Sequence, residues 1–171
     1  AADLITLRGK EKLEQADIVI YAGSLVNPQL LTYTREGCEI HNSASMTLEQ
    51  VIEVMIRGEK EGKRVVRLHT GDPCIYGAIR EQMDLLDKAG ISYTVTPGVS
   101  SFIGAAAALK AEFTLPDVSQ TVILTRMAGR TPVPEKEEIS RLSSHHATMV
   151  IFLSASMLDA LSKQLIEGGY E

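Results

Sequence analysis

The chain has 171 residues, of which 44% are hydrophobic and 23% are charged, and its net charge is −5. The length suffices for one domain, or for one domain and part of another, and the composition is that of an ordinary globular protein. The negative charge and the lack of a basic run argue against a nucleic-acid partner, and no apolar window approaches the length of a membrane span.

Helical patterns and apolar strand-like runs alternate along the chain. The expected elements, in chain order, are helix 5–16, strand 17–22, helix 28–35, strand 38–43, helix 47–60, strand 64–69, helix 75–89, strand 92–96, helix 100–111, strand 121–126, helix 135–144, strand 148–154 and helix 157–168. Thr47 and Gln50 have the spacing of a capping box at the start of one helix. This alternation predicts an α/β fold with strand–helix units on a mostly parallel sheet.

The pattern of the sequence changes after Leu115-Pro116-Asp117. The run of strand–helix units ends here, and one further strand leads into a Pro/Gly-rich loop, AGRTPVPE. We therefore place a domain boundary here and expect an N-terminal α/β domain over residues 1–116 and the start of a second α/β domain over residues 117–171.

Three expected strands end in loops of small and polar residues: TGDPCIYG (70–77), TPGVSS (96–101) and LSAS (153–156). Parallel strands place their carboxyl ends at one sheet edge, where open α/β sheets bind ligands. Turn chemistry is the alternative, because Asp72 can cap a helix that Pro73 begins. Ser100 and Ser101 likewise fit a helix N-cap, and a capping residue can also contact a ligand.

Few residues suggest a metal or an acid–base site. Cys38 and Cys74 give neither a disulfide framework nor metal-ligand spacing, which indicates a reducing cytoplasm. His145 and His146 are adjacent and would point apart, so we expect no metal site. His69 is interpreted as a residue packed at a strand end.

The segment RMAGRTPVPE (126–135) places Arg126 and Arg130 in one loop stiffened by proline and glycine. Both arginines could be ordinary surface residues. They could also form a paired site for carboxylates, because guanidinium groups bind carboxylates with matched geometry.

Taken together, these motifs resemble the tetrapyrrole methylases, the S-adenosylmethionine-dependent enzymes of cobalamin and sirohaem synthesis. The resemblance covers the whole chain and rests on DLITLRG, ADIVIYAGSLV, HTGDPCIYGAIREQ, TPGVSSF, TVILTR with GRTPVPE, and IFLSAS. Within the family, the chain is most similar to the branch that methylates C11 of precorrin-4 or of cobalt-precorrin-4.

The resemblance implies two α/β domains with the cofactor in the cleft between them. Family members open with a strand and a glycine-rich loop before the DLITL segment, and they continue beyond the second domain's first strand–helix units. We therefore expect this chain to lack the first strand and the end of the second domain. A homodimer is expected as well.

Carried over residue by residue, the family's contacts with S-adenosylmethionine, or with the product S-adenosylhomocysteine, fall on eight positions. They are Thr70, Gly71, Asp72, Ile75, Ser100, Ser101, Leu153 and Ser154. Arg126 and Arg130 are the expected substrate-binding residues, on the carboxylates of a tetrapyrrole. One branch of the family has an aspartate after the tyrosine of its second strand, but this chain has Tyr21-Ala22-Gly23-Ser24, and no catalytic base is assigned.

Two other functions remain open at this point. The chain could belong to another tetrapyrrole methylase, such as a different precorrin methyltransferase or diphthine synthase. It could also be a non-catalytic nucleotide-binding domain that uses the same loops to hold a regulatory ligand.

Overall fold

The computed structural model describes residues 1–171 apart from the side chain of Ser24. The chain divides into two compact units, Ala1–Gly104 and Ala105–Glu171. They are described separately below as the first and the second unit.

The first unit contains a parallel sheet of three strands, β1 (Ile18–Tyr21), β2 (Glu39–Asn42) and β3 (Val65–Leu68). The strand order is β2-β1-β3, and Ile18 lies opposite Glu39 on one side and Val65 on the other. Because all three strands run in one direction, their carboxyl ends share one edge of the sheet. The expected α/β class is confirmed.

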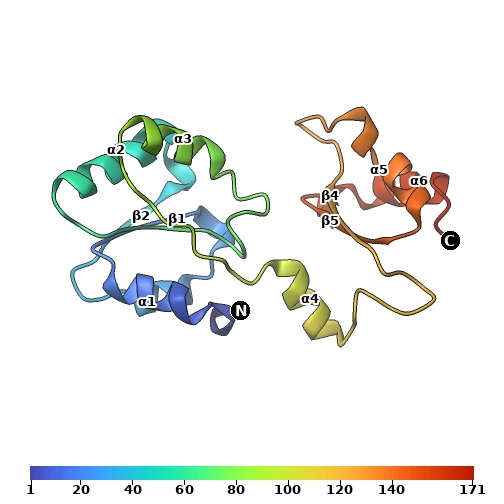
Figure 1. The fold of residues 1–171 in the computed structure, drawn as a ribbon, viewed down its shortest axis with the longest axis horizontal. Coiled ribbons are helices and arrows are strands. Elements are labelled where there is room, and N and C mark those ends of the chain that lie inside the picture. The colour runs from blue at the N-terminus through green and yellow to red at the C-terminus, as the bar shows by residue number, and fades with distance from the viewer. The chain divides into compact units, whose positions relative to one another are not determined.

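Helices cover both faces of this sheet (Figure 1), with α1 (Leu7–Gln15) on one face and α2 (Leu48–Lys60) and α3 (Arg80–Lys88) on the other. The alternation of side chains along β1 explains this layering. Ile18 and Ile20 pack into a cluster with residues of α2 and α3, whereas Val19 packs with Leu13 of α1. A strand buried on both faces reads as a continuous apolar run, as IVI does here.

The start of α2 is fixed by local sequence. The Thr47 hydroxyl accepts a hydrogen bond from the Gln50 amide, and the Gln50 side chain accepts one from the Thr47 amide. This capping box confirms the expected helix start, because it satisfies two backbone donors that a helix N-terminus leaves free.

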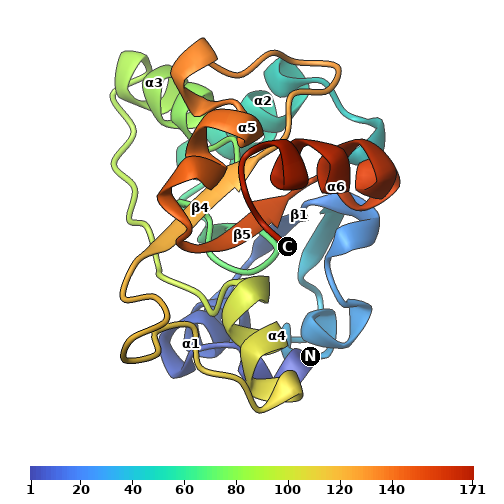
Figure 2. The same ribbon diagram turned by 90° about the vertical axis from the view of Figure 1, so that its right-hand side faces the viewer.

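The second unit contains a parallel pair, β4 (Val122–Arg126) and β5 (Thr148–Phe152), with Val122 opposite Thr148. Helices α5 (Ile139–Leu142) and α6 (Leu158–Glu167) lie beside this pair (Figure 2). Ile139 and Leu161 form its core with Met127, against Met149 and Ile151 of β5. Helix α4 (Ser101–Leu109) runs across the division between the units.

The remaining helical turns are short 3-10 segments. They are η1 (Ala2–Leu4), η2 (Gly23–Leu25), η3 (Pro28–Tyr33), η4 (Ser43–Ser45), η5 (Glu135–Glu137), η6 (Ser143–His145) and η7 (Ala155–Met157). None of the described helices is long and apolar enough to cross a bilayer.

The two compact units divide between Gly104 and Ala105, which is earlier than the domain boundary expected between residues 116 and 117. The Thr148 hydroxyl on β5 donates to the Phe113 carbonyl at 2.8 Å, and the Thr148 amide donates to the Ser119 hydroxyl at 3.1 Å. The segment 113–119 is thus tied to the second unit. The expected domain limits remain a prediction about the family's architecture.

Several expected elements differ from the structure. Residues 92–96 form no strand, since none of the described strands pairs with them. The helix expected from residue 75 begins only at Arg80, because Tyr76 and Ala78 have left-handed backbones, with φ of 53° and 51°. The expected helix over 28–35 is the 3-10 helix η3, and the one over 135–144 is broken into η5, α5 and η6.

Candidate functional site

The candidate site of the first unit lies where β3 ends and the chain enters loop 70–77. A second segment, loop 96–101, meets it there. The Gly98 amide donates to Asp72 Oδ2 at 2.9 Å, across a sequence separation of 26 residues. The two loops therefore meet, as expected, although residues 92–96 form no strand and only loop 70–77 follows a strand of the sheet.

The two loops touch through their backbones. A Cβ atom on Gly98 would lie 2.0 Å from the Gly71 carbonyl oxygen, so only glycine fits this crossing. Gly71 itself has φ +63°, and a Cβ there would lie 3.2 Å from Ser100 Cα. We call Gly71, Asp72 and Gly98 the Asp72 junction.

Asp72 also shapes its own loop. Its Oδ1 accepts the Cys74 amide hydrogen at 2.8 Å, the Asx-turn geometry in which a side chain bonds the backbone two residues on. Asp72 therefore has a turn role within the loop, but the expected helix cap at Asp72 is wrong. It does not cap α3, whose start has no side-chain cap.

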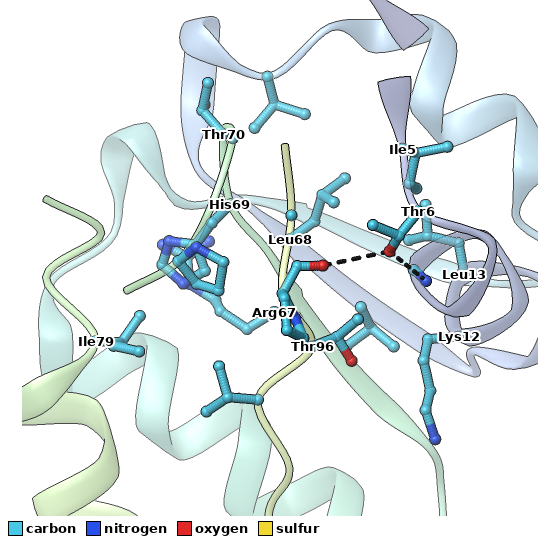
Figure 3. A pocket seen from close by; sticks show the side chains of 18 of the residues that line it. Ile5, Thr6, Lys12, Leu13, Arg67, Leu68, His69, Thr70, Ile79 and Thr96 are labelled. Atoms are coloured by element: carbon cyan, nitrogen blue, oxygen red, sulfur yellow. Dashed lines mark hydrogen bonds between the residues drawn. The ribbon is translucent and has the colours of Figure 1, made fainter. Parts of the chain in front are cut away.

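A second connection comes from the start of α1 (Figure 3). The Thr6 hydroxyl accepts the Gly9 amide hydrogen at 3.2 Å and donates to the Pro97 carbonyl at 3.3 Å. Thr6 therefore caps α1 and ties it to loop 96–101. Sequence analysis missed this role, because the bond to Pro97 spans 91 residues.

A cavity of about 960 Å³ opens beside β3 in the first unit, and Figure 3 shows part of its wall. Among the expected cofactor residues, Thr70, Gly71, Ser100 and Ser101 line it, whereas Asp72 and Ile75 do not. The lining also includes Leu13 from one face of the sheet and Leu86 from the other. The cavity is therefore larger than a loop-edge site and extends along the side of β3 that does not face β1.

Ser100 and Ser101 occupy the start of α4. The Ser100 carbonyl accepts amide hydrogens from Ile103 at 3.0 Å and from Gly104 at 3.3 Å, and its side chain is buried. The predicted position of Ser100 at the head of a helix is confirmed, while Ser101 is exposed and lines the cavity.

His69 and Arg67 are the titratable groups of the cavity wall at the end of β3 (Figure 3). Burial lowers the pKa of His69 to about 4, with a further contribution from the charge of Arg67. Burial also lowers the pKa of Arg67, which donates to the Ile20 carbonyl at 3.0 Å and to Gln82 Oε1 at 3.3 Å. His69 is therefore neutral near pH 7, in keeping with a residue packed at a strand end.

In the second unit, the end of β5 carries Leu153 and Ser154. Leu153 has a left-handed backbone with φ 56°, and its side chain is 71% exposed. The buried Ser154 hydroxyl donates to the Phe152 carbonyl at 2.8 Å and accepts the Met127 amide hydrogen at 3.2 Å. We call Met127, Phe152 and Ser154 the Ser154 junction, because it ties the ends of β4 and β5 together.

Arg126 is engaged in the loop that follows β4. Its guanidinium donates to the Thr131 carbonyl at 3.0 Å and to the Pro132 carbonyl at 2.6 Å. Arg130, within that loop, is exposed and forms no ion pair with the described carboxylates. The two arginines share one loop, as expected, but only Arg130 has its donors free of the loop's own carbonyls.

The expected cofactor residues thus fall into two groups. Thr70, Gly71, Asp72, Ser100 and Ser101 converge in the first unit, and Leu153 and Ser154 lie in the second. Ile75 is half-buried, and its amide donates to the Asp72 carbonyl at 3.2 Å, which closes the turn of loop 70–77.

The group in the first unit offers main-chain groups and hydroxyls to a polar ligand. Gly71 has a left-handed backbone, and the missing side chain lets loop 96–101 approach it, since a Cβ there would lie 3.2 Å from Ser100 Cα. The exposed Ser101 hydroxyl can donate or accept a hydrogen bond. Because the loops present main-chain groups and hydroxyls, the site is one that binds and orients.

Comparison with known proteins gives a consistent picture. The family model for Tetrapyrrole (Corrin/Porphyrin) Methylases matches residues 1–171. A cobalt-precorrin-4 C(11)-methyltransferase of Methanocaldococcus jannaschii is 59% identical over 168 residues, which are 98% of this chain and 65% of that protein. A precorrin-4 C(11)-methyltransferase of Mycobacterium tuberculosis is 44% identical, with 99% of this chain and 68% of that protein covered.

Solved structures agree. The structure of a cobalamin biosynthetic enzyme, cobalt precorrin-4 methyltransferase, superimposes with a TM-score of 0.96 at 48% identity, covering 99% of this chain and 71% of that one. A uroporphyrin-III C-methyltransferase from Thermus thermophilus in complex with S-adenosylhomocysteine gives a TM-score of 0.75 at 20% identity, which shows a shared fold. The chain spans about 65% of the length of the M. jannaschii relative.

Proposed function

The chain belongs to the tetrapyrrole (corrin/porphyrin) methylases, and from this premise we propose that the protein methylates C11 of cobalt-precorrin-4 with S-adenosylmethionine as donor. The observation that carries the proposal is the match to the cobalt precorrin-4 methyltransferase structure, with a TM-score of 0.96 at 48% identity. The cobalt-containing substrate is favoured over the metal-free one because the 59% and 49% identical relatives are named for the cobalt form.

In this proposal Thr70, Gly71 and Ser101, on the two loops that the Asp72 junction joins, bind and orient the cofactor. The cofactor supplies a methyl group on a positively charged sulfur, which an electron-rich ring carbon can attack in line. Such a displacement needs alignment of donor and acceptor and exclusion of water. Main-chain groups and hydroxyls suffice for these tasks.

We further propose that Arg130 binds carboxylates of the tetrapyrrole and that Arg126 supports this contact by holding the loop. A net charge of −5 repels an anionic substrate unless cations gather at the site. Arg126 stiffens the loop through its bonds to Thr131 and Pro132, which fixes the position from which Arg130 can reach a carboxylate.

We also propose that the protein is a cytoplasmic homodimer. Both cysteines are free thiols, as expected in a reducing compartment, and Leu158 and Ile166 on α6 are exposed apolar side chains that an interface would cover. Light scattering on the protein in solution tests the dimer, and a monomeric mass would contradict it.

Transfer of a labelled methyl group tests the activity. We expect the protein to move label from S-adenosylmethionine to cobalt-precorrin-4, with slower transfer to metal-free precorrin-4. If the label reached neither substrate, the proposed function would be wrong, and equal rates would remove the cobalt preference.

Gly71→Ala tests the position of the cofactor site. Its Cβ would lie 3.2 Å from Ser100 Cα, so we expect at least a tenfold loss of affinity for S-adenosylhomocysteine in calorimetry. Gly62→Ala is the matched control, since Gly62 has nearly the same φ, +66° against +63°, but no atom within 4 Å of its Cβ position. An equal loss in both variants would count against a site at loop 70–77.

A further inference from the structure

The carboxylate of Asp72 is fully engaged within the protein. Oδ1 accepts the Cys74 amide hydrogen at 2.8 Å, and Oδ2 accepts the Gly98 amide hydrogen at 2.9 Å. Asp72 forms no ion pair with the described cations, so its charge is balanced by backbone dipoles alone. It is also absent from the cavity wall that Thr70 and Gly71 line.

The position of Gly98 depends on this carboxylate. Residues 92–99 belong to no helix or strand, so their backbone lacks the ladder bonds that would hold it in place. Side chains of the described residues attach loop 96–101 to its surroundings: Asp72 accepts the Gly98 amide hydrogen, and the Thr6 hydroxyl donates to the Pro97 carbonyl. The bond from Asp72 reaches loop 70–77, and hydrogen bonds to a charged acceptor are about twice as strong as neutral ones.

From these contacts we propose that Asp72 is a positioning residue for cofactor binding, rather than a residue that contacts the cofactor. Its carboxylate holds Gly98 against Gly71 and thereby sets Ser100 and Ser101 at the distance from loop 70–77 that the ligand requires. This inference rests on the proposed function. It replaces a direct ligand contact of the Asp72 side chain with a structural one.

Hydrogen exchange in the ligand-free protein tests the hydrogen bond itself. The Gly98 amide lies outside regular structure, so its protection should come from Asp72. We expect a protected Gly98 amide in the wild type and exchange about 10- to 100-fold faster in Asp72→Asn, the range that corresponds to the loss of one charge-assisted bond. Asparagine keeps the size of the side chain but turns an NH₂ group toward one of the two amides.

The matched control is Asp84→Asn, the same change at a half-exposed carboxylate that pairs with Arg80 at 3.0 Å along α3. This variant should leave Gly98 exchange and cofactor affinity unchanged. An unprotected Gly98 amide in the wild type, or unchanged exchange in Asp72→Asn, would overturn the proposal. Protection of the Gly98 amide is measured in the wild-type protein, so this part of the test remains possible even if Asp72→Asn fails to fold.

Affinity and kinetics separate positioning from a purely structural role. At a temperature where both proteins are folded, Asp72→Asn should bind S-adenosylhomocysteine about tenfold more weakly and raise the KM for the methyl donor, with the tetrapyrrole KM unchanged. Wild-type affinity in folded Asp72→Asn would show that the residue only stabilises the fold, and would overturn the positioning role. If the wild type itself did not bind S-adenosylhomocysteine, the proposed function would fail while the exchange results still tested the Asp72–Gly98 bond.

Discussion

The two units join their strand-end loops in different ways. At the Asp72 junction a half-buried carboxylate accepts two backbone amide hydrogens, and two glycines allow the chains to touch. At the Ser154 junction a buried neutral hydroxyl accepts one amide hydrogen and donates to a carbonyl. The first arrangement needs residues without side chains at the crossing, whereas the second places an exposed leucine beside it.

This difference has a physical basis. A carboxylate has acceptors only, so it can join two chain segments that both offer amide donors. A serine hydroxyl has a donor and acceptors, so it joins a donor and a carbonyl at the ends of paired strands. We infer that the first junction governs loop spacing and that the second governs the pairing of β4 with β5.

The largest loss of stability is expected when a side chain is added at the backbone contact between Gly98 and Gly71. Gly98→Ala places a Cβ within 2.0 Å of the Gly71 carbonyl oxygen, and backbone atoms cannot yield as a flexible side chain does. Overpacking of this kind should destabilise the first unit by about 3 kcal/mol, measured from the exchange of β1 amides. Gly129→Ala in the second unit is the control, because its Cβ would meet only the flexible Met157 side chain, with Cε at 3.6 Å and Sδ at 3.8 Å. Equal stability of both variants would contradict the close backbone contact.

The Ser154 junction should respond more moderately. Ser154→Ala leaves the Met127 amide without its acceptor in a buried position, which costs about 2 kcal/mol. Exchange of β4 and β5 amides should accelerate, with β1 unaffected. Ser144→Ala, which removes an exposed hydroxyl bonded to the Arg141 carbonyl, should change little. A neutral Ser154→Ala would show that the junction does not hold the pair.

Substitution of the two arginines distinguishes loop support from ligand contact. Arg130→Ala should raise the tetrapyrrole KM about tenfold without changing stability, since one charge-assisted bond is lost. Arg126→Ala should raise the KM similarly and also increase exchange in residues 127–132, because three carbonyl contacts disappear. Lys163→Ala, an exposed cation on α6, is the control. An unchanged tetrapyrrole KM in both arginine variants would show that neither arginine binds the substrate.

The smallest loss of stability is expected when the pH is lowered below 6.5. The pKa of His69 is about 4, below the usual 6.5, so between these values the unfolded chain binds more protons than the folded one. The stability of the first unit should therefore be complete above pH 6.5 and fall as the pH drops toward 4. Allowing for solvent screening, the loss is about 1 kcal/mol.

His69→Gln should remove this part of the pH dependence, as followed by the exchange of β1 amides between pH 4 and 7. His145→Gln, at an exposed position in the second unit, should leave it intact. A pH profile of the first unit that does not change in His69→Gln would contradict the assignment.

Features set by neighbours in sequence could be predicted from the sequence alone. The capping box at Thr47 and Gln50 involves residues three apart, and the buried run of β1 is visible as consecutive apolar residues. The motifs around residues 70–77 and 96–101 identified the family and predicted that the two loops lie together. In each case the determining interaction lies within a few residues or in a pattern of the whole family.

Only the tertiary structure decided the features that join distant segments. The strand expected over 92–96 fails because strand structure requires a paired neighbour, which no local pattern can supply. The late start of α3 follows from left-handed backbones at Tyr76 and Ala78, where the sequence has no glycine to signal them. Asp72 was identified from its motif, but its bond to Gly98 spans 26 residues, so its role in joining two loops became visible only when the folded chain brought them together.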